Sequence, residues 1–402
     1  MRNVIFILVV FLFVIAESKG QRQVDNNDLL TVDVTKSYST KKELILQDFM
    51  DVEYIVLETN DEFVNQGIVM DIGKNVILVR NKIDDGDIFV YDRSGKALRK
   101  INNKGQQNSR EYTYILGITL DEDNNEMFVN DHRTGRILAY DLYGNFKRSF
   151  RHKQSPGNPY SCYTSIFNYD KKNLICYYEE IGMRKSRTFV LISKKDGSIV
   201  NEFKIPYKEH IPVQVTWKVE NKNEKQNEAT FVTARPDHYR TSIPFKGAWS
   251  LLELSSDTVY TISPKYKLHP FLVRTPPIQS MNLKVFLLLN LFSDRYYFMA
   301  TMKGEYDKKT ETGFPRTSFM YDRQEKEFFK YAVYNGDYST KKEIDLNELR
   351  PVNHEIESWQ LLESFQLVED YEKGILKGKL KEIAGKLDEE DNPVILLIKH
   401  KK

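Results

Sequence analysis

The chain has 402 residues, a formal net charge of +2 and an aromatic share of 12%. A charge so close to zero argues against the strong basic field that nucleic-acid binding requires, so we expect no nucleic-acid partner. Beyond the N-terminal apolar run, no stretch approaches the roughly eighteen consecutive apolar residues of a membrane helix, so we expect no membrane span in the mature chain.

The first twenty residues have the pattern of a secretory signal peptide. An unbroken apolar run extends from Val4 to Ala16, and Ser18 and Gly20 are the small residues expected before a cleavage ahead of Gln21. The run is short for a bilayer span, although an uncleaved anchor stays an alternative. No cysteine lies near the cut, which excludes a lipoprotein. We therefore predict Sec-dependent export to the periplasm or the exterior.

Two stretches that lie forty-nine residues apart are near copies of each other. Each reads as strand, turn and strand, with Tyr91-Asp92 and Gly95 in the first copy and Tyr140-Asp141 and Gly144 in the second. Asp can hydrogen-bond its own backbone and Gly tolerates a positive φ, so both residue types favour a turn. Another hairpin pattern precedes each copy, at 69–79 and 118–129. Four strands in about fifty residues are typical of one β-propeller blade.

Weaker copies continue along the chain at 189–203, 249–262 and 296–333, which brings the count to about six blades. One blade cannot bury its apolar faces alone, so the ring must close. Apolar strands are predicted near both ends, at Val52–Leu57 and Asp391–Lys399. We expect these two strands to pair in one blade, because that pairing removes exposed sheet edges.

Two segments near the C-terminus have helical spacing. Ile356–Tyr371 and Lys377–Leu387 each place apolar residues on one stripe, and the pattern breaks near Gly374 and Gly378. A helix packed on the propeller rim with its lysines in solvent is favoured over an amphipathic membrane helix. The predicted fold class is therefore all-β: a six-bladed β-propeller of four-stranded blades over residues 21–402, closed by its terminal strands, with a helical insertion at about 356–387.

The two cysteines, Cys162 and Cys176, are predicted to be free and buried. Residues 160–169 and 174–179 read as a hairpin that pairs Asp170 with Asn173. Cys176 then faces Phe167, which places the two sulfurs about 16 Å apart, beyond the reach of a disulfide.

No motif for a metal, a cofactor or a catalytic group is present, and we predict none of the three. The acidic stretch Asp121–Glu126 lacks the Gly and the final Glu of a calcium loop, so it is interpreted as a solvated hairpin turn. Asp84–Asp87 is interpreted in the same way. The seven histidines have no zinc-binding spacing, and neither a nucleophile elbow nor a phosphate loop occurs.

The candidate ligand site is assembled from loops. It consists of Arg133, which follows the second strand of a blade, and of Arg235, His238, Tyr239 and Arg240 in a polar interval without strands. Arginine, tyrosine and histidine together can stack on and hydrogen-bond a sugar or a peptide. An ordinary charged surface loop is the alternative.

Several short segments resemble those of a known family, the exported six-bladed β-propellers of Gram-negative gut-type bacteria, which are similar to NHL-repeat propellers. In chain order they are Val52–Glu58, the Tyr-Asp-x-x-Gly turns, Lys104–Gln106 leading to Glu111-Tyr112, Ser256–Tyr260 and Leu387–Val394. The chain departs from the family at Gln107–Arg110, where a Gly-Pro-Gly loop is usual. The resemblance implies a fold and an exported location, but no reaction or ligand.

The sequence thus favours a binding or scaffolding module at the cell envelope, with a glycan, a peptide or an envelope protein as its partner. The rival hypothesis is a lyase or hydrolase that acts on a polysaccharide at the propeller mouth, which requires convergent ionisable groups. A third hypothesis is an interaction protein that docks through its C-terminal helices, which requires an exposed apolar patch on them.

Overall fold

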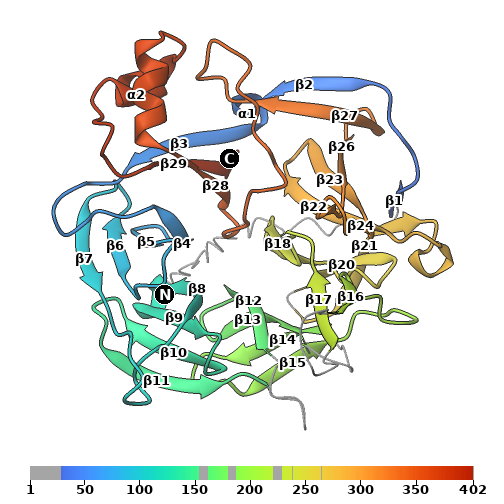
Figure 1. The fold of residues 1–402 in the computed structure, drawn as a ribbon, viewed down its shortest axis with the longest axis horizontal. Helices are drawn as coiled ribbons and strands as arrows, with labels where there is room; N and C mark the ends of the chain where they lie inside the picture. Colours follow the sequence, from blue (N-terminus) through green and yellow to red (C-terminus); the bar gives the residue numbers. More distant parts are fainter. Residues whose placement is uncertain are drawn as a thin grey trace, which may run out of the picture.

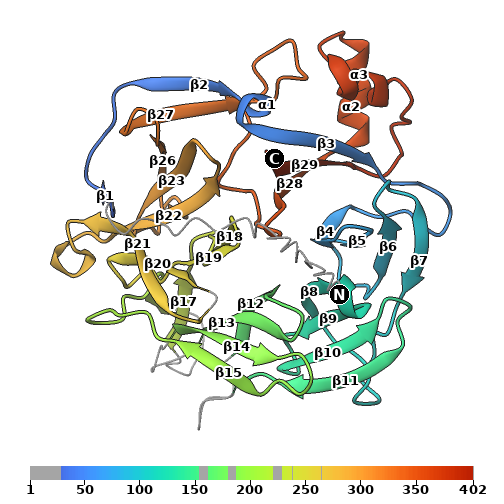
Figure 2. The same ribbon diagram turned by 180° about the vertical axis from the view of Figure 1, so that it is seen from behind.

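The computed structural model describes residues 29–153, 162–179, 187–220, 229–237, 239–263 and 265–401. Six sheets stand around a central axis and form the predicted six-bladed β-propeller (Figures 1 and 2). The predicted signal peptide lies outside the described residues. Among those residues, no helix is long and apolar enough to cross a membrane.

Blades 1 to 3 each consist of four consecutive antiparallel strands, in the order of the chain from the centre to the rim. Blade 1 contains β4 (Ile68–Ile72), β5 (Val76–Arg80), β6 (Ile88–Asp92) and β7 (Ala97–Ile101). Blade 2 contains β8 (Ile115–Asp121), β9 (Glu126–Asp131), β10 (Arg136–Asp141) and β11 (Phe146–Arg151). Blade 3 contains β12 (Cys162–Asn168), β13 (Asn173–Glu179), β14 (Arg187–Ser193) and β15 (Ile199–Phe203).

Blades 4 and 5 follow the same plan, after the hairpin of β16 (Val215–Glu220) and β17 (Ala229–Ala234). Blade 4 contains β18 (Ser242–Phe245), β19 (Ala248–Leu251), β20 (Thr258–Ile262) and β21 (Leu268–Thr275). Blade 5 contains β22 (Val285–Phe292), β23 (Tyr296–Lys303), β26 (Arg316–Asp322) and β27 (Glu327–Tyr334), with the short pair β24 (Tyr306–Asp307) and β25 (Thr312–Gly313) between its middle strands. Two single 3-10 turns, η1 (Glu122–Asn124) and η2 (Ile278–Ser280), complete the connections.

Blade 6 closes the ring as predicted, because it joins the two ends of the chain. It contains β28 (Ile356–Leu362), β29 (Val394–His400) and β3 (Met50–Val56). β29 and β3 pair antiparallel over seven residues, from Val394 opposite Val56 to His400 opposite Met50. The innermost position of this blade is taken by residues 349–352, which run beside β28 without forming a regular strand: the Val352 N–H donates to the Glu357 carbonyl at 3.2 Å.

The N-terminal segment also adds strands that the sequence analysis did not predict. β1 (Leu30–Asp33) pairs in parallel with β21, and β2 (Lys41–Ile45) pairs in parallel with β27. Each becomes a fifth, outermost strand, and α1 (Leu46–Phe49) then leads into β3. Residues 30–56 therefore run around the rim of three neighbouring blades, as the blue ribbon in Figure 1 shows.

Six apolar clusters fill the six interfaces between blades. Strand β13 shows how this works, since Leu174, Cys176 and Tyr178 belong to the cluster shared with blade 2. Ile175 and Tyr177, which alternate with them, belong to the cluster shared with blade 4. A strand buried on both faces reads as a continuous apolar run, which is the pattern of the middle strands here.

The repeated turn glycines have a common structural reason. Gly95 and Gly144 adopt φ angles of 91° and 89°, which residues with a Cβ rarely adopt. Each turn also abuts the outermost strand of the preceding blade: a Cβ on Gly95 would lie 2.0 Å from the Val56 carbonyl oxygen, and one on Gly144 would lie 2.7 Å from Ile101. The repeat that identified the fold therefore marks the contacts between blades.

The acidic turn at 121–126 is a contact between blades rather than the solvated hairpin that we predicted. The Glu122 carboxylate accepts hydrogen bonds from the backbone N–H groups of Lys74, Asn75 and Val76 in blade 1, at 2.8 to 2.9 Å. Asp121 is fully buried and pairs with Lys194 of blade 3 at 2.7 Å. The turn between β8 and β9 thus joins three consecutive blades.

The prediction for the C-terminal region was wrong at its beginning. Residues 356–362 form strand β28, because they pair with β29 in the closing blade. The helices are α2 (Ser364–Glu372) and α3 (Gly378–Ala384), and the break between them falls where it was predicted, at two glycines with positive φ. Leu367, Leu380 and Ala384 are buried in one cluster together with Tyr338 and Val394, so the helices pack on the rim of blade 6.

Both cysteines are free and buried, as predicted, although the hairpin register differs by one residue. Cys176 lies opposite Ile166 rather than Phe167. The Asp170 carboxylate accepts hydrogen bonds from the N–H groups of Lys172 and Asn173, and the resulting loop is one residue longer than expected. Burial raises the pKa of Cys162 to about 11, so this thiol is unreactive at neutral pH.

Asn392 is the residue whose replacement should test the closure most directly. Its side-chain amide donates to the carbonyls of Glu58 and Phe63, at 2.9 and 2.6 Å, and its oxygen accepts the Asn65 N–H at 2.8 Å. Asn392→Ala leaves these buried groups without partners, so we expect a loss of about 2 to 4 kcal/mol in the free energy of unfolding. Denaturant unfolding measures this loss, with the exposed Glu389→Ala in the same loop as control. Equal stability of the two variants would contradict the assigned role.

Candidate functional site

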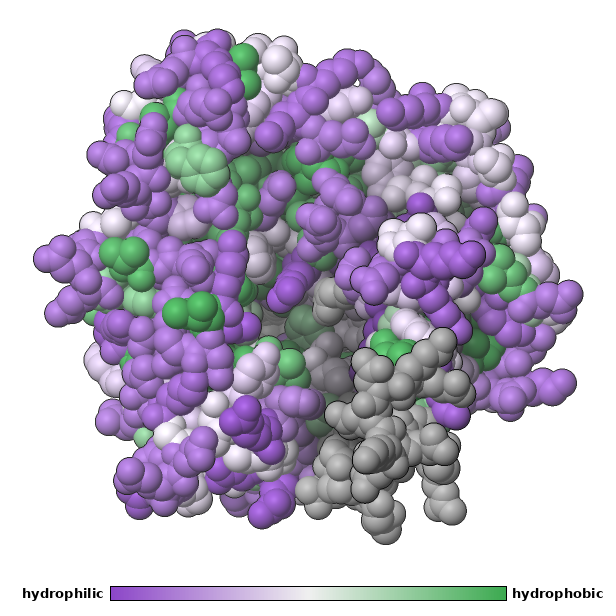
Figure 3. Space-filling model, viewed as in Figure 1, coloured by the Kyte–Doolittle hydropathy of each residue, from purple (hydrophilic) through white to green (hydrophobic). Residues whose placement is uncertain are grey.

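The candidate site is a cavity of about 140 Å³ in the central channel. Figure 3 shows the molecule hollowed at the centre of the ring. The innermost segments of five blades line the cavity: Val69–Asp71 of blade 1, Leu116–Thr119 of blade 2, Thr164–Phe167 of blade 3, Tyr239–Ser242 of blade 4 and Arg350–Val352 of blade 6. The cavity therefore exists only in the closed ring.

The turn that follows residue 352 spans the channel at one end. The Asn353 side chain donates to the Ile72 carbonyl of blade 1 at 3.0 Å. The His354 ring lies against Trp249 of blade 4, with 5.4 Å between ring centroids. This turn bridges blades on opposite sides of the axis, so a ligand has less room to enter from this end.

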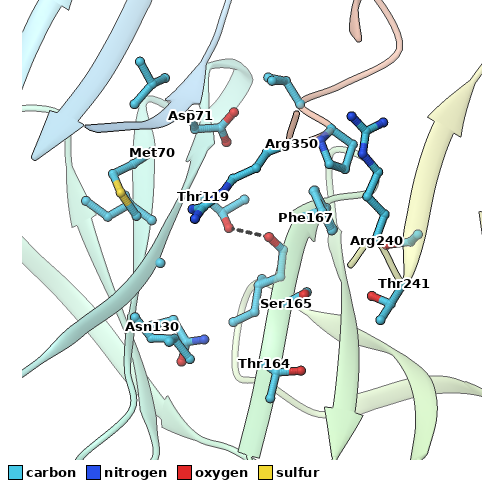
Figure 4. A pocket seen from close by; sticks show the side chains of 18 of the residues that line it. Met70, Asp71, Thr119, Asn130, Thr164, Ser165, Phe167, Arg240, Thr241 and Arg350 are labelled. Atoms are coloured by element: carbon cyan, nitrogen blue, oxygen red, sulfur yellow. Dashed lines mark hydrogen bonds between the residues drawn. The ribbon is translucent and has the colours of Figure 1, made fainter. Parts of the chain in front are cut away.

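The innermost strand of each blade has backbone N–H and C=O groups along its inner edge that no further strand pairs. Side chains from the neighbouring blade make hydrogen bonds to some of these groups. Asp71 of blade 1 accepts the Leu120 N–H of blade 2 at 2.7 Å and its neighbour's N–H, that of Ile72, at 2.8 Å. Thr119 of blade 2 donates to the Ile166 carbonyl of blade 3 at 3.0 Å, the hydrogen bond drawn in Figure 4. The polar lining of the cavity is thus partly structural.

Asp71 is the only carboxylate among the described residues that line the cavity. Burial raises the pKa of Asp71 to about 7, although the hydrogen bonds from the two backbone N–H groups act to lower it. Both of its oxygens already accept a backbone hydrogen bond. Its first task is therefore to hold blades 1 and 2 together.

Of the residues predicted from sequence, Tyr239 and Arg240 line the cavity. Arg133 does not: it is exposed in the turn between β9 and β10, where its N–H donates to Asp131 at 3.1 Å. Arg235 is exposed after β17 and does not line the cavity either. His238 lies outside the described residues. The structure thus brings together two of the five, and their role in ligand binding remains a prediction.

Arg240 is held by a buried ion pair that crosses from blade 4 to blade 6. Its guanidinium lies 2.6 Å from the Glu357 carboxylate and donates to the Leu349 carbonyl at 3.0 Å. Both side chains are almost fully buried, 4% and 1% exposed. Burial raises the pKa of Glu357 to about 7, and the guanidinium offsets part of that rise. Arg240 therefore braces the ring and has little freedom to follow a ligand.

Sequence reasoning missed most residues that line the cavity, among them Gly117, Asn130 and Arg350. Gly117 has no atom within 4 Å of the position where a Cβ would stand, so this strand position faces open space. Asn130 lies three residues before the predicted Arg133, near the end of strand β9. The repeat register could have placed Gly117 on an inner strand, whereas no sequence pattern marked Arg350, which lies in a segment without a strand signal.

The Arg240–Glu357 pair predicts a characteristic mutational pattern. Glu357→Leu leaves a buried guanidinium unpaired, and we expect a loss of about 3 to 5 kcal/mol in the free energy of unfolding. The double variant Arg240→Met/Glu357→Leu removes both charges and should recover most of that loss, because well-packed apolar side chains often replace a buried pair without cost. Denaturant unfolding of both variants decides this, and a double variant no more stable than the single one would refute it.

Comparison with known proteins agrees with this architecture. Residues 29–399 match the family described as "Domain of unknown function (DUF4934)". None of the curated proteins matches the sequence. A solved structure from Bacteroides fragilis, of a protein thought to be exported, is 14% identical with a TM-score of 0.53, over 90% of this chain and 99% of that one.

Two further solved structures are more distant. A member of the DUF4221 family from Bacteroides vulgatus is 8% identical with a TM-score of 0.43, over 88% of this chain and 98% of that one. A virginiamycin B lyase from Staphylococcus aureus is 10% identical with a TM-score of 0.34, over 88% and 100%. Of the three, only the Bacteroides fragilis protein is similar enough to indicate a shared fold, which confirms the fold implied by the resemblance to exported gut-type propellers. With nearly its whole length matched, the chain belongs to the DUF4934 family.

Proposed function

We propose that this protein is an exported binding module of the cell envelope that holds its ligand in the central channel. The observation that carries the proposal is the composition of the cavity wall. Hydroxyl, amide, aromatic and guanidinium groups from five blades face one small space, and the single carboxylate among the described lining residues is engaged by backbone N–H groups. Such a wall offers hydrogen bonds to a ligand without offering a pair of catalytic groups.

Export rests on two supports. The N-terminal apolar run with its small-residue cleavage site has the pattern of a Sec signal peptide. The structurally similar Bacteroides fragilis protein is thought to be exported as well. The partner is then a molecule found in the periplasm or outside the cell, and a glycan, a peptide or an envelope protein are the classes to test.

The rival hypothesis of a lyase or hydrolase has one observation in its favour. The pKa of Asp71 is raised to about 7, which is the range of a general acid or base. Hydrolysis of a glycosidic bond normally uses two carboxyl groups across the bond. Glu357 does not line the cavity and is tied to Arg240, so the described residues do not supply a second group.

Docking through the C-terminal helices has weaker support. The apolar face of α2 and α3 is already buried against blade 6, and their exposed large apolar residues are Phe365 and Tyr371. Two separated side chains do not make the contiguous patch that such docking requires.

Gly117→Leu tests whether the channel is the binding site. The added side chain fills the cavity from a position with no close neighbour, so we expect the fold to be kept and ligand binding to be lost. Residues 21–402 are purified and applied to an array of bacterial and host glycans and to envelope extract, and thermal unfolding is recorded in parallel. Ser149→Leu, at an exposed position on β11 of the same blade, is the matched control.

Binding by the wild type and Ser149→Leu, but not by Gly117→Leu, supports the channel as the site. Undiminished binding by Gly117→Leu would move the site elsewhere on the propeller. Turnover of a bound polysaccharide, seen as newly released chain ends and abolished by Asp71→Asn, would favour the enzyme instead.

A further inference from the structure

Arg350 is a cation of the cavity wall to which the described part of the chain offers no side-chain partner. It lies on the innermost segment of blade 6, its side chain is exposed, and Figure 4 shows the side chain crossing the cavity toward Thr119. Among the described residues, no carboxylate forms an ion pair with it and no acceptor receives a hydrogen bond from it. This sets it apart from Arg240, which Glu357 neutralises.

A second arginine adds to the positive charge at this position. Arg80, at the end of β5, donates from Nη1 to the Asn81 carbonyl at 3.0 Å, while its buried Nε has no hydrogen-bond partner. Although Arg350 is exposed to the channel, partial desolvation by the surrounding protein lowers its pKa, and the charge of Arg80 lowers it further, so the two guanidinium groups act on each other. Two cations that repel each other in a partly desolvated place are stabilised when an anion joins them.

Asn130 provides an independent sign of a missing ligand group. It is 3% exposed, and its Nδ2 donates to the Tyr163 carbonyl at 2.9 Å. Its Oδ1 is buried without any hydrogen-bond partner, although the residue lines the same cavity. An unpaired buried acceptor is costly, so this oxygen is suited to receive a hydroxyl or N–H donor from a ligand.

The remaining wall indicates the class of ligand. The hydroxyl groups of Thr119, Ser165 and Thr241 face the cavity with the aromatic ring of Phe167. Trp359 lines it as well. Hydroxyl groups match the many donors and acceptors of a sugar, and aromatic rings match its apolar faces. A volume of about 140 Å³ has room for one such ring or for its substituents, not for a folded peptide.

We propose that the cavity binds a uronic acid residue of a glycan, with the Arg350 guanidinium on the sugar carboxylate and Asn130 Oδ1 accepting a sugar hydroxyl. This inference rests on the proposed binding function and names its ligand class. The charge of Arg80 acts on the same guanidinium. The sugar carboxylate would supply the negative charge that the described residues do not provide at Arg350.

The experiment is a calorimetric titration of purified residues 21–402 with five probes: glucuronate, galacturonate, their neutral counterparts glucose and galactose, and an acetylated tripeptide with a free C-terminal carboxylate. Arg350→Gln is compared with Arg110→Gln and Arg151→Gln, which remove the same charge from exposed positions that do not line the cavity. We expect the wild type and both controls to bind a uronate, and Arg350→Gln to bind it at least about tenfold more weakly, since charge-assisted hydrogen bonds are lost. Binding to the uronate should also weaken as salt is raised.

Asn130→Ala gives a second measurement, with thermal unfolding to confirm that the variant folds. We expect it to weaken uronate binding while leaving the salt dependence unchanged, because it removes a neutral acceptor. Equal affinity of the wild type and Arg350→Gln for the uronates would overturn the inference, as would binding of the tripeptide alone or of none of the probes. The array experiment with Gly117→Leu tests the proposed function separately. Binding of a neutral glycan in the channel would contradict the inference of an acidic ligand but would leave the proposed binding function intact.

Discussion

The antiparallel pairing of β29 with β3 is the constraint on which the rest of the structure depends. A blade buries the apolar residues of a face only when another blade packs against that face. The last of the six interfaces therefore forms only when the two ends of the chain meet in blade 6. Strands β3 and β29 contribute to the apolar clusters on both sides of blade 6. Loss of this pairing would therefore expose two interfaces at once and leave two open sheet edges.

The N-terminal segment extends this closure along the rim. β2 and β1 add parallel outer strands to blades 5 and 4, so a single stretch of chain holds three neighbouring blades. At the centre, the buried Arg240–Glu357 pair performs the same task from blade 4 to blade 6. Ring closure is thus supported by backbone pairing at the rim and by an ion pair near the axis. The buried pair favours the closed arrangement of blades 4 and 6, because either charge buried without its partner would destabilise the fold.

The central cavity is a consequence of the same geometry. Five inner strands and the innermost segment of blade 6 meet around the axis. The side chains of Asp71 and Thr119 hydrogen-bond some of the backbone groups along their uncovered edges. Among the described residues, two groups of the cavity wall are left without partners: the Arg350 guanidinium, and the buried Oδ1 of Asn130. Polar groups without partners in a cavity wall support the proposal that the channel binds a ligand.

The sequence by itself determined the blade repeat, the closure by the terminal strands and the buried free thiols, because turn glycines, continuous apolar runs and strand lengths are local properties. It misassigned residues 356–362 as helix, since their apolar spacing fits both structures and only pairing with β29 decides between them. It missed β1 and β2, because short polar strands on a rim carry no periodic signal. The cavity was decided by the tertiary structure alone: Gly117 and Asn130 pair within one hairpin of blade 2, but only ring closure brings Arg350 of blade 6 to the same space.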